Sequence, residues 1–182
     1  MATSLLLQGK AALITGAAGG LGKAIAAKFL SAGAKRVYIC DINGPRLEEA
    51  IKELTPLGAV TGLQADITKE QDVAEMFGKA KDVNIVVNNA GIIDRFDPVG
   101  TLDKVLWDKV LAINLTAPYL VSKHAVKTME AGSGGVILNV GSTSSLMGFR
   151  AGKDLLPSPS TRLNVSRRSG LHGLQARHHR FN

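Results

Sequence analysis

The stretch from Lys10 to Gly22, KAALITGAAGGLG, passes from a short apolar run into a helical pattern across several glycines. The apolar run predicts a buried strand, and apolar residues at helical spacing after Gly20 predict a helix. Glycines leave the N–H groups and the positive end of the helix dipole open to a diphosphate. Although a lone glycine-rich turn is a weak signal, this strand–turn–helix context favours a dinucleotide phosphate site. Its candidate residues are Thr15, Gly16, Gly20, Leu21 and Gly22.

The same alternation of strand and helix continues along the chain. Further strands are predicted at Val37–Cys40, Ala59–Ala65, Asn84–Val87 and Val136–Val140, with helices from Gly44 to near Pro56, from Glu70 to Ala80 and from Thr101 to Glu130. In the last helix Leu102, Val105, Leu106, Val110 and Ile113 are spaced for burial. Five strands alternating with four helices predict an α/β fold with a doubly wound parallel sheet of the Rossmann type. The pattern stops after Arg150, so we expect the sheet to be incomplete at its C-terminal side.

Length and composition predict one domain, with 182 residues of which 45% are hydrophobic. No apolar run approaches the ~20 residues of a membrane span, and no signal peptide is evident. We therefore expect a cytoplasmic protein that does not bind membranes. The single cysteine, Cys40, excludes an internal disulfide and an all-cysteine metal cluster.

The net charge of +7 comes mostly from residues 151–182, which hold six Lys and Arg against one Asp. A nucleic-acid partner is not expected, because no aromatic stacking platform accompanies these cations. His172, His178 and His179 lack cysteine partners, so no metal site is expected. We therefore divide the chain into a dinucleotide-binding domain, 1–150, and a basic tail, 151–182, that we expect to be disordered.

Acidic side chains follow the second and third predicted strands. Asp41 lies 19 residues beyond Gly22, where a carboxylate can accept hydrogen bonds from an adenosine ribose and would repel a 2′-phosphate. A solvated turn residue is the alternative. Asp66, followed by Ile67, lies at the sheet edge where ligands bind, although a capping or turn role fits it equally well. Thr68 is in the expected N-cap position of the next helix.

Amides and a serine occupy the later part of the predicted site. Asn88, Asn89, Ala90 and Gly91 follow the fourth strand, and a tight loop there is an equally good reading. Asn114 falls inside the long helix, where a functional or kink-stabilising role competes with plain surface exposure. Ser142 follows the fifth strand, and strand ends on this edge point at the ligand crevice.

With these residues in place, the chain resembles the short-chain dehydrogenase/reductase family over roughly residues 1–150. The motifs that carry the resemblance are Thr15-Gly16-x-x-x-Gly20-x-Gly22, Asp66 with Thr68, Asn88-Asn89-Ala90-Gly91, Asn114 and Ser142. The resemblance implies hydride transfer between a small secondary alcohol or ketone and NAD(P), with Asp41 selecting NAD over NADP.

It further implies a role for each of the later motif residues. Asp66 and Ile67 would lie beside the adenine, while Asn88, Ala90 and Gly91 would support the sheet near the cofactor. Ser142 would polarise the substrate oxygen, and Asn114 would hold a water in the proton relay. Family members form oligomers, but the dimer-forming helix after the fifth strand is missing here.

The family's acid/base is a tyrosine with a lysine four residues later, located after the serine. This chain has only two tyrosines, Tyr38 and Tyr119, and both precede Ser142. Tyr119 and Lys123 fit the spacing, but we interpret them as a chance i, i+4 pair on the helix before the fifth strand. The sequence thus predicts an oxidoreductase that is inactive as written. The alternative is a catalytically dead protein that binds nucleotides or modulates a dimer.

The tail offers an explanation for the missing pair. Residues 169–182 can be encoded so that reading from the second base gives Val-Ala-Tyr-Thr-Ala-Ser-Lys, and Gly152-Lys153 can be encoded as the splice-donor-like string GGT AAG. We hypothesise that residues from about Gly152 to Ser169 translate an unspliced intron, after which the frame is wrong. A natural C-terminus is the competing reading.

Overall fold

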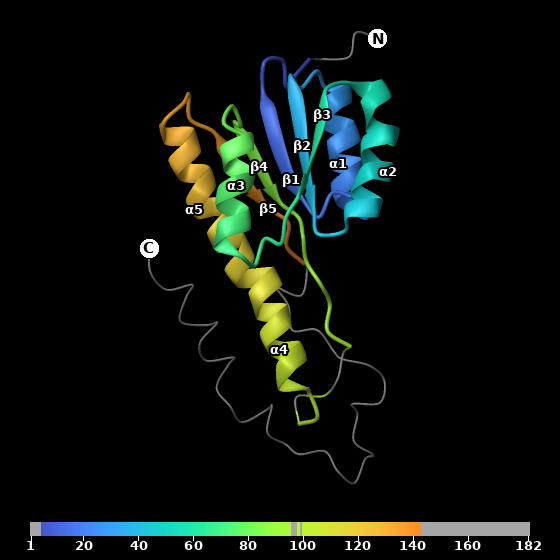
Figure 1. Ribbon diagram of the computed structural model, residues 1–182, viewed down its shortest axis with the longest axis vertical. Coiled ribbons are helices and arrows are strands. Elements are labelled where there is room, and N and C mark those ends of the chain that lie inside the picture. The colour runs from blue at the N-terminus through green and yellow to red at the C-terminus, as the bar shows by residue number, and fades with distance from the viewer. Residues whose placement is uncertain (1–4, 96–97, 99, 143–182) are drawn as a thin grey trace, which may run out of the picture.

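The computed structural model describes residues 5–95, 98 and 100–142. Five parallel strands form one sheet in the order β3-β2-β1-β4-β5 (Figure 1). The strands are β1 Ala11–Thr15, β2 Arg36–Asp41, β3 Val60–Gln64, β4 Ile85–Asn88 and β5 Val136–Asn139. The strand order reverses between β1 and β4, which is the switch point where open α/β sheets bind ligands.

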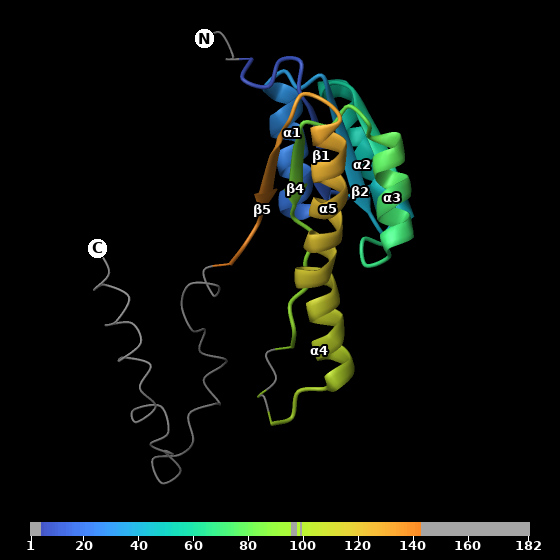
Figure 2. The ribbon, with the colours of Figure 1, turned by 90° about the vertical axis from the view of Figure 1, so that its left-hand side faces the viewer.

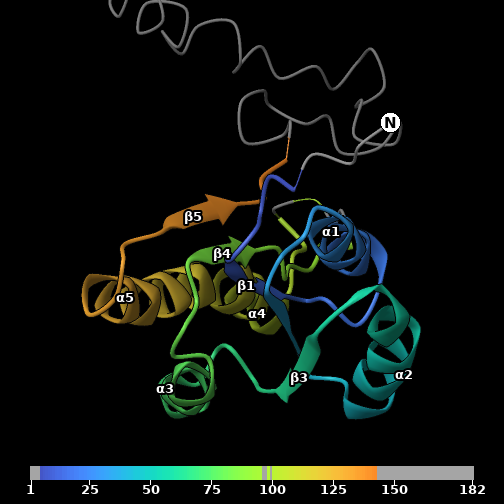
Figure 3. The same ribbon diagram turned by 90° about the horizontal axis from the view of Figure 1, so that it is seen from above.

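Helices cover both faces of this sheet, as Figure 3 shows from above. One face carries α1 Gly20–Ser31 and α2 Gly44–Leu54, which continues into the short 3₁₀ turn η1 Thr55–Leu57. The other face carries α3 Glu70–Lys79 and the helical run of α4 Lys104–Leu111, the π-helical segment η2 Ala112–Thr116 and α5 Ala117–Glu130. The predicted doubly wound α/β fold is therefore confirmed.

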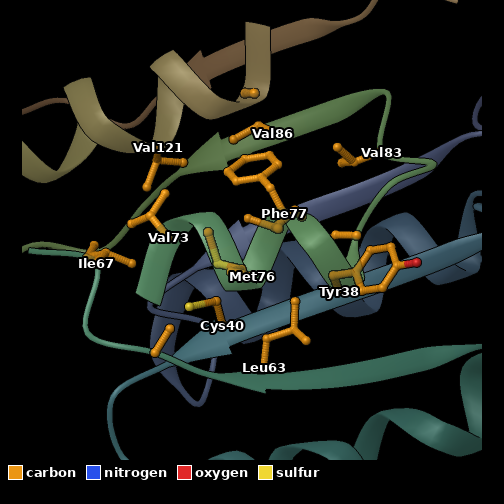
Figure 4. Close-up of a cluster of buried hydrophobic side chains, with 14 of the residues drawn as sticks. Tyr38, Cys40, Leu63, Ile67, Val73, Met76, Phe77, Val83, Val86 and Val121 are labelled. Carbon is orange, nitrogen blue, oxygen red and sulfur yellow. The ribbon is translucent and has the colours of Figure 1, made fainter. Parts of the chain in front are cut away.

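Side chains of the central strands alternate between two hydrophobic cores. In β2, Val37 and Ile39 pack toward α1 and α2, whereas Tyr38 and Cys40 pack toward α3 and α5. Figure 4 shows the second core, in which Phe77 of α3 lies among side chains from several strands. Because strand side chains alternate and both faces are covered, these strands are apolar without interruption, which is the pattern that the sequence showed.

Two local expectations are wrong. Thr68 is not the N-cap of α3: Lys69 takes that position with extended backbone, and Thr68 donates its hydroxyl to Asp66 instead. The apolar residues of α4 are not buried either, and Val105 is 72% exposed. Figure 2 gives the reason, since α4 runs on beyond the ends of the strands and has no sheet to pack against.

The strands differ in how much they bury. All five residues of β1 are buried, whereas none of the four residues of β5 is. Among the described residues β5 is the last strand on its side of the sheet. The expected tail, 151–182, lies outside the described residues.

Candidate functional site

A cleft of about 1190 Å³ opens at the carboxyl ends of the strands. Ligand pockets are typically ~300–1,000 Å³, so the cleft has room for a large ligand. It collects most of the predicted site on one surface: Gly16, Gly20, Leu21, Asp41, Asp66, Ile67, Asn88, Ala90, Gly91, Asn114 and Ser142 all line it. Thr15 and Gly22 are buried beneath the residues that line the cleft.

Glycine is required in the loop between β1 and α1. Gly16 has φ of +63°, and a Cβ there would meet the Ala90 Cα at 2.8 Å. At Gly22 a Cβ would meet the Gly16 carbonyl oxygen at 2.5 Å and the Asn89 Nδ2 at 2.6 Å. Gly20 has φ of +52° with open space around it. The loop is therefore a bare backbone cradle at a helix N-terminus, which fits a diphosphate.

Thr15 and Asn89 hold this cradle from below. The buried Thr15 Oγ1 accepts hydrogen bonds from the backbone N–H groups of Asn89 and Ala90, each at 3.1 Å. In return, Asn89 Nδ2 donates to the carbonyl oxygens of Thr15 at 2.9 Å and Gly16 at 3.1 Å. Asn89 belongs to the Asn88-Asn89-Ala90-Gly91 motif, but the sequence did not assign it these contacts with the glycine-rich loop. Its amide couples β4 to the glycine-rich loop.

Asp41 ends β2 at one side of the cleft. Its Oδ2 accepts from the Ala18 N–H at 3.1 Å, and its Oδ1 accepts from the Asn43 N–H at 3.0 Å. A carboxylate has about four lone-pair sites, so both oxygens keep capacity for ligand hydroxyls. The carboxylate is thus anchored in the cleft wall as well as forming a turn.

Asp66 is both a turn residue and part of the cleft. Its Oδ1 accepts from the Thr68 hydroxyl at 2.6 Å and from the Thr68 N–H at 3.1 Å. The hydrogen bond from the Thr68 hydroxyl is the main cause that lowers the pKa of the Asp66 carboxyl below its ordinary value. The carboxylate is therefore charged at neutral pH, with Ile67 beside it in the lining.

The amide of Asn114 clamps the loop after β4. Its Oδ1 accepts from the Ile92 N–H at 2.9 Å, and its Nδ2 donates to the Ile92 carbonyl oxygen at 2.8 Å. Asn114 lies in η2, and single π-helical turns occur frequently at functional sites. Asn114 is thus exposed but bonded to this loop, and its role at the site stays a prediction.

Tyr119 and Lys123 do not form a pair at the cleft. Tyr119 lines the cleft and is 61% exposed. Lys123 instead places its Nζ 2.6 Å from the Glu70 Oε1, across the contact between α5 and α3. That hydrogen bond with Glu70 raises the pKa of the Lys123 ammonium above its ordinary value. Lys123 is therefore already engaged with a carboxylate of another helix.

The described part of the chain shows neither a metal cluster nor a membrane-spanning helix. No group of three His, Cys, Asp or Glu residues there is arranged to hold a metal ion. No helix within 5–95 and 100–142 is long and apolar enough to cross a membrane. The three tail histidines lie outside the described residues.

Comparisons with known proteins agree with this geometry. A short chain dehydrogenase/reductase of Gibberella zeae is 49% identical over 153 residues, which cover 81% of this chain and 56% of that protein. One from Macrophomina phaseolina is 44% identical over 155 residues, 81% of this chain and 88% of that protein. The structure of NAD⁺-bound xylitol dehydrogenase superposes with a TM-score of 0.77 at 26% identity, covering 80% of this chain and 58% of that one.

The chain thus spans a little over half the length of two of these three proteins. Residues 10–153 match the profile of the family described as short chain dehydrogenase. The cleft, the glycine cradle and these matches lead to one conclusion: the chain belongs to the short-chain dehydrogenase/reductase family, whose members bind NAD(P) and act on small alcohols or ketones.

Proposed function

We propose that this chain binds NAD(H) in its cleft, in preference to NADP(H). The observation that carries the proposal is the Asp41 carboxylate, fixed by two backbone N–H groups at the end of β2, beside the glycine cradle. There it accepts hydrogen bonds from the adenosine ribose and repels a 2′-phosphate. Ala17, Ala18 and Gly19 supply no cation to offset that repulsion, and Arg46 is the nearest basic residue of the lining.

The reaction that this cleft supports best is oxidation of a small secondary alcohol or reduction of the matching ketone. Bound nicotinamide supplies or accepts the hydride. In this proposal the Ser142 hydroxyl hydrogen-bonds the substrate oxygen, and Asn114 keeps the loop at Ile92 in place and holds a water for the proton relay. Asp66 and Ile67 lie beside the adenine. Asn88, Ala90 and Gly91 support the sheet near the cofactor.

The tyrosine and lysine that would transfer the substrate proton are absent from their expected place after Ser142. A serine hydroxyl at its ordinary pKa is a poor base, no tyrosine follows Ser142 in the sequence, and Lys123 is held by Glu70. We therefore propose turnover close to background for the chain as written. The Lys123–Glu70 pair favours a second candidate function, a nucleotide-binding or dimer-modulating protein without catalysis. In either case we propose a cytoplasmic protein without nucleic-acid or membrane partners, able to form homo-oligomers.

Cofactor titration tests the preference. NADH should bind more tightly than NADPH, and Asp41→Ala should weaken NADH binding about tenfold or more, because hydrogen bonds to a charged group contribute ~1.5–3 kcal/mol. Glu48→Ala is the matched control, since it removes an exposed carboxylate of α2 that does not line the cleft. Equal or tighter binding of NADPH by the unsubstituted chain would contradict the proposal.

Turnover is tested by restoration. A variant in which the shifted frame is corrected, so that Tyr-Thr-Ala-Ser-Lys follows Ser142, should oxidise secondary alcohols at least about a hundredfold faster than the chain as written. Comparable rates for the two, abolished by Tyr119→Phe, would show that Tyr119 is the acid/base.

A further inference from the structure

Three polar side chains meet at the carboxyl ends of β4 and β5. Asn88 closes β4, Asn139 closes β5 and Ser122 lies in α5. Asn88 is only 5% exposed, and its Nδ2 donates to the Asn139 Oδ1 at 2.8 Å and to the Ser122 Oγ at 3.1 Å. We call these three residues the strand-end junction. It joins two strands and a helix that are far apart in the sequence.

The junction is also tied through the backbone. Asn88 and Asn139 are the last register pair of β4 and β5, and the Val140 N–H donates to the Asn88 carbonyl oxygen at 2.9 Å. From there the chain runs through Gly141 to Ser142, and all of these residues line the cleft. The junction therefore determines where the chain leaves β5 and enters the cleft wall.

Hydrophobic burial holds β5 only at Ile137, which is partly buried against the core. Val136 and Leu138 are exposed, and no residue of β5 is buried. A strand held in this way has few contacts that fix its end, whereas a buried polar network specifies one arrangement. The strand-end junction is accordingly the specific anchor of the β5 carboxyl end within the described residues.

Each half of a bound dinucleotide has its own side of the sheet. A carboxylate at the end of β2 marks the adenosine side, and the N-terminus of α1 marks the diphosphate. The nicotinamide half then lies over the ends of β4 and β5, on the other side of the switch point. The strand-end junction is on that side, away from Asp41.

We propose that Ser122 and Asn139 are positioning residues for the nicotinamide half of the cofactor, acting through Asn88. They hold the end of β5, and the Ser142 that follows it, in the cleft wall beside the nicotinamide half. This inference rests on the proposed NAD(H) binding and adds two residues that the sequence did not single out.

The test compares NADH with ADP-ribose, which carries the adenosine and diphosphate but no nicotinamide. Binding of both ligands to the full chain is measured for Ser122→Ala and Asn139→Leu. Loss of one hydrogen bond should raise the dissociation constant of NADH about three- to tenfold, while that of ADP-ribose changes by less than about twofold. Ser122→Thr and Asn139→Asp keep the accepting oxygen and should restore NADH binding.

Ser133→Ala is the matched control. Ser133 Oγ accepts a hydrogen bond from Asn84 Nδ2 at 3.3 Å, the same kind of bond at the opposite end of β4 and away from the cleft. This variant should leave the ratio of the two dissociation constants unchanged. Thermal unfolding of each variant identifies any variant that fails to fold. If Asn139→Leu fails to fold, the result for Ser122→Ala decides the test.

The outcomes are distinct. Equal weakening of NADH and ADP-ribose would mean that the junction only stabilises the fold, and it would overturn the inference, as would no weakening of NADH. If the unsubstituted chain binds ADP-ribose as tightly as NADH, the inference falls while the adenosine half of the proposed function stands. If it binds neither ligand, the proposed function itself is wrong.

Discussion

The two sides of the cleft are held together by different forces. On the β1 and β2 side the strands are buried on both faces, and the glycine cradle packs so closely against Ala90 at Gly16 and against Asn89 at Gly22 that a Cβ does not fit at either glycine. On the β5 side the strand is exposed and α4 buries no residue. There, side-chain hydrogen bonds from Asn88 and Asn114 take the place of packing. In the proposed NAD(H) complex, the adenosine side is thus preformed by the core, whereas the nicotinamide side depends on a few side-chain hydrogen bonds.

The largest test of this contrast uses one substitution in two strands. Leu13 in β1 is 0% exposed and Leu138 in β5 is 50% exposed. Leu13→Ala should lower the free energy of unfolding by about 2–5 kcal/mol, because it leaves a cavity between fully packed neighbours. Leu138→Ala should lower it by less than about 1 kcal/mol. Urea unfolding measures both, and similar losses would remove the contrast.

A smaller effect is expected at the glycine cradle. Gly22→Ala should destabilise the fold by about 1–3 kcal/mol, since its Cβ meets the Gly16 carbonyl oxygen and the neighbouring backbone must shift. It should also weaken NADH binding.

Gly78→Ala provides the control for this variant. Gly78 lies in α3 with no atom within 4 Å of an added Cβ, so alanine there should stabilise the helix by about 0.5–1 kcal/mol. If Gly22→Ala left the free energy of unfolding unchanged, the cradle would be less tightly packed than its geometry indicates.

The smallest effect concerns Asp66 and depends on pH. Its pKa is lowered in the folded state, so its ionised form adds stability above the unfolded pKa, and that stability is lost as the pH falls through the lower folded value. Thr68→Val removes the main hydrogen bond and should cost about 0.5–1.5 kcal/mol at pH 7. The difference in free energy of unfolding between Thr68→Val and the unsubstituted chain should shrink below about pH 4, where the unfolded carboxyl is protonated. The same difference in free energy at pH 3 as at pH 7, measured by urea unfolding, would contradict the stabilising role of the ionised Asp66.

The same contrast explains what could be predicted from the sequence. The adenosine side is encoded locally, because a strand, its glycines and the next helix are contiguous, and Asp41 follows at a known spacing. The expected sheet is confirmed there, and most of the candidate residues line the cleft, whereas their part in cofactor binding stays a prediction. Thr68 was misassigned because its hydroxyl has two local partners to choose from, the helix N–H groups or the Asp66 carboxylate, and the second is charged.

The nicotinamide side depends on contacts that sequence patterns do not contain. Periodicity indicated a buried face on α4 but not that the helix extends past the sheet. Ser122 and Asn139 lie 34 and 51 residues from Asn88, so nothing local linked them. Asn114, within the π-helical turn, likewise bonds Ile92, which lies 22 residues away in the loop after β4.

The most direct test of NAD(H) binding in this cleft is a hydrogen-exchange footprint of NADH on the full chain. Ligand bound only to the folded state at about 100 times its dissociation constant adds ~2.7 kcal/mol of stability, which slows all amides that exchange by global unfolding. Amides that exchange by local opening are slowed only where the opening disrupts the bound ligand. We predict protection of residues 16–22, 41–43 and 88–91, with little change in the outer turns of α2. Binding of NADH without protection of the glycine cradle, or with new protection of locally opening amides only outside the cleft, would contradict the assignment of this cleft.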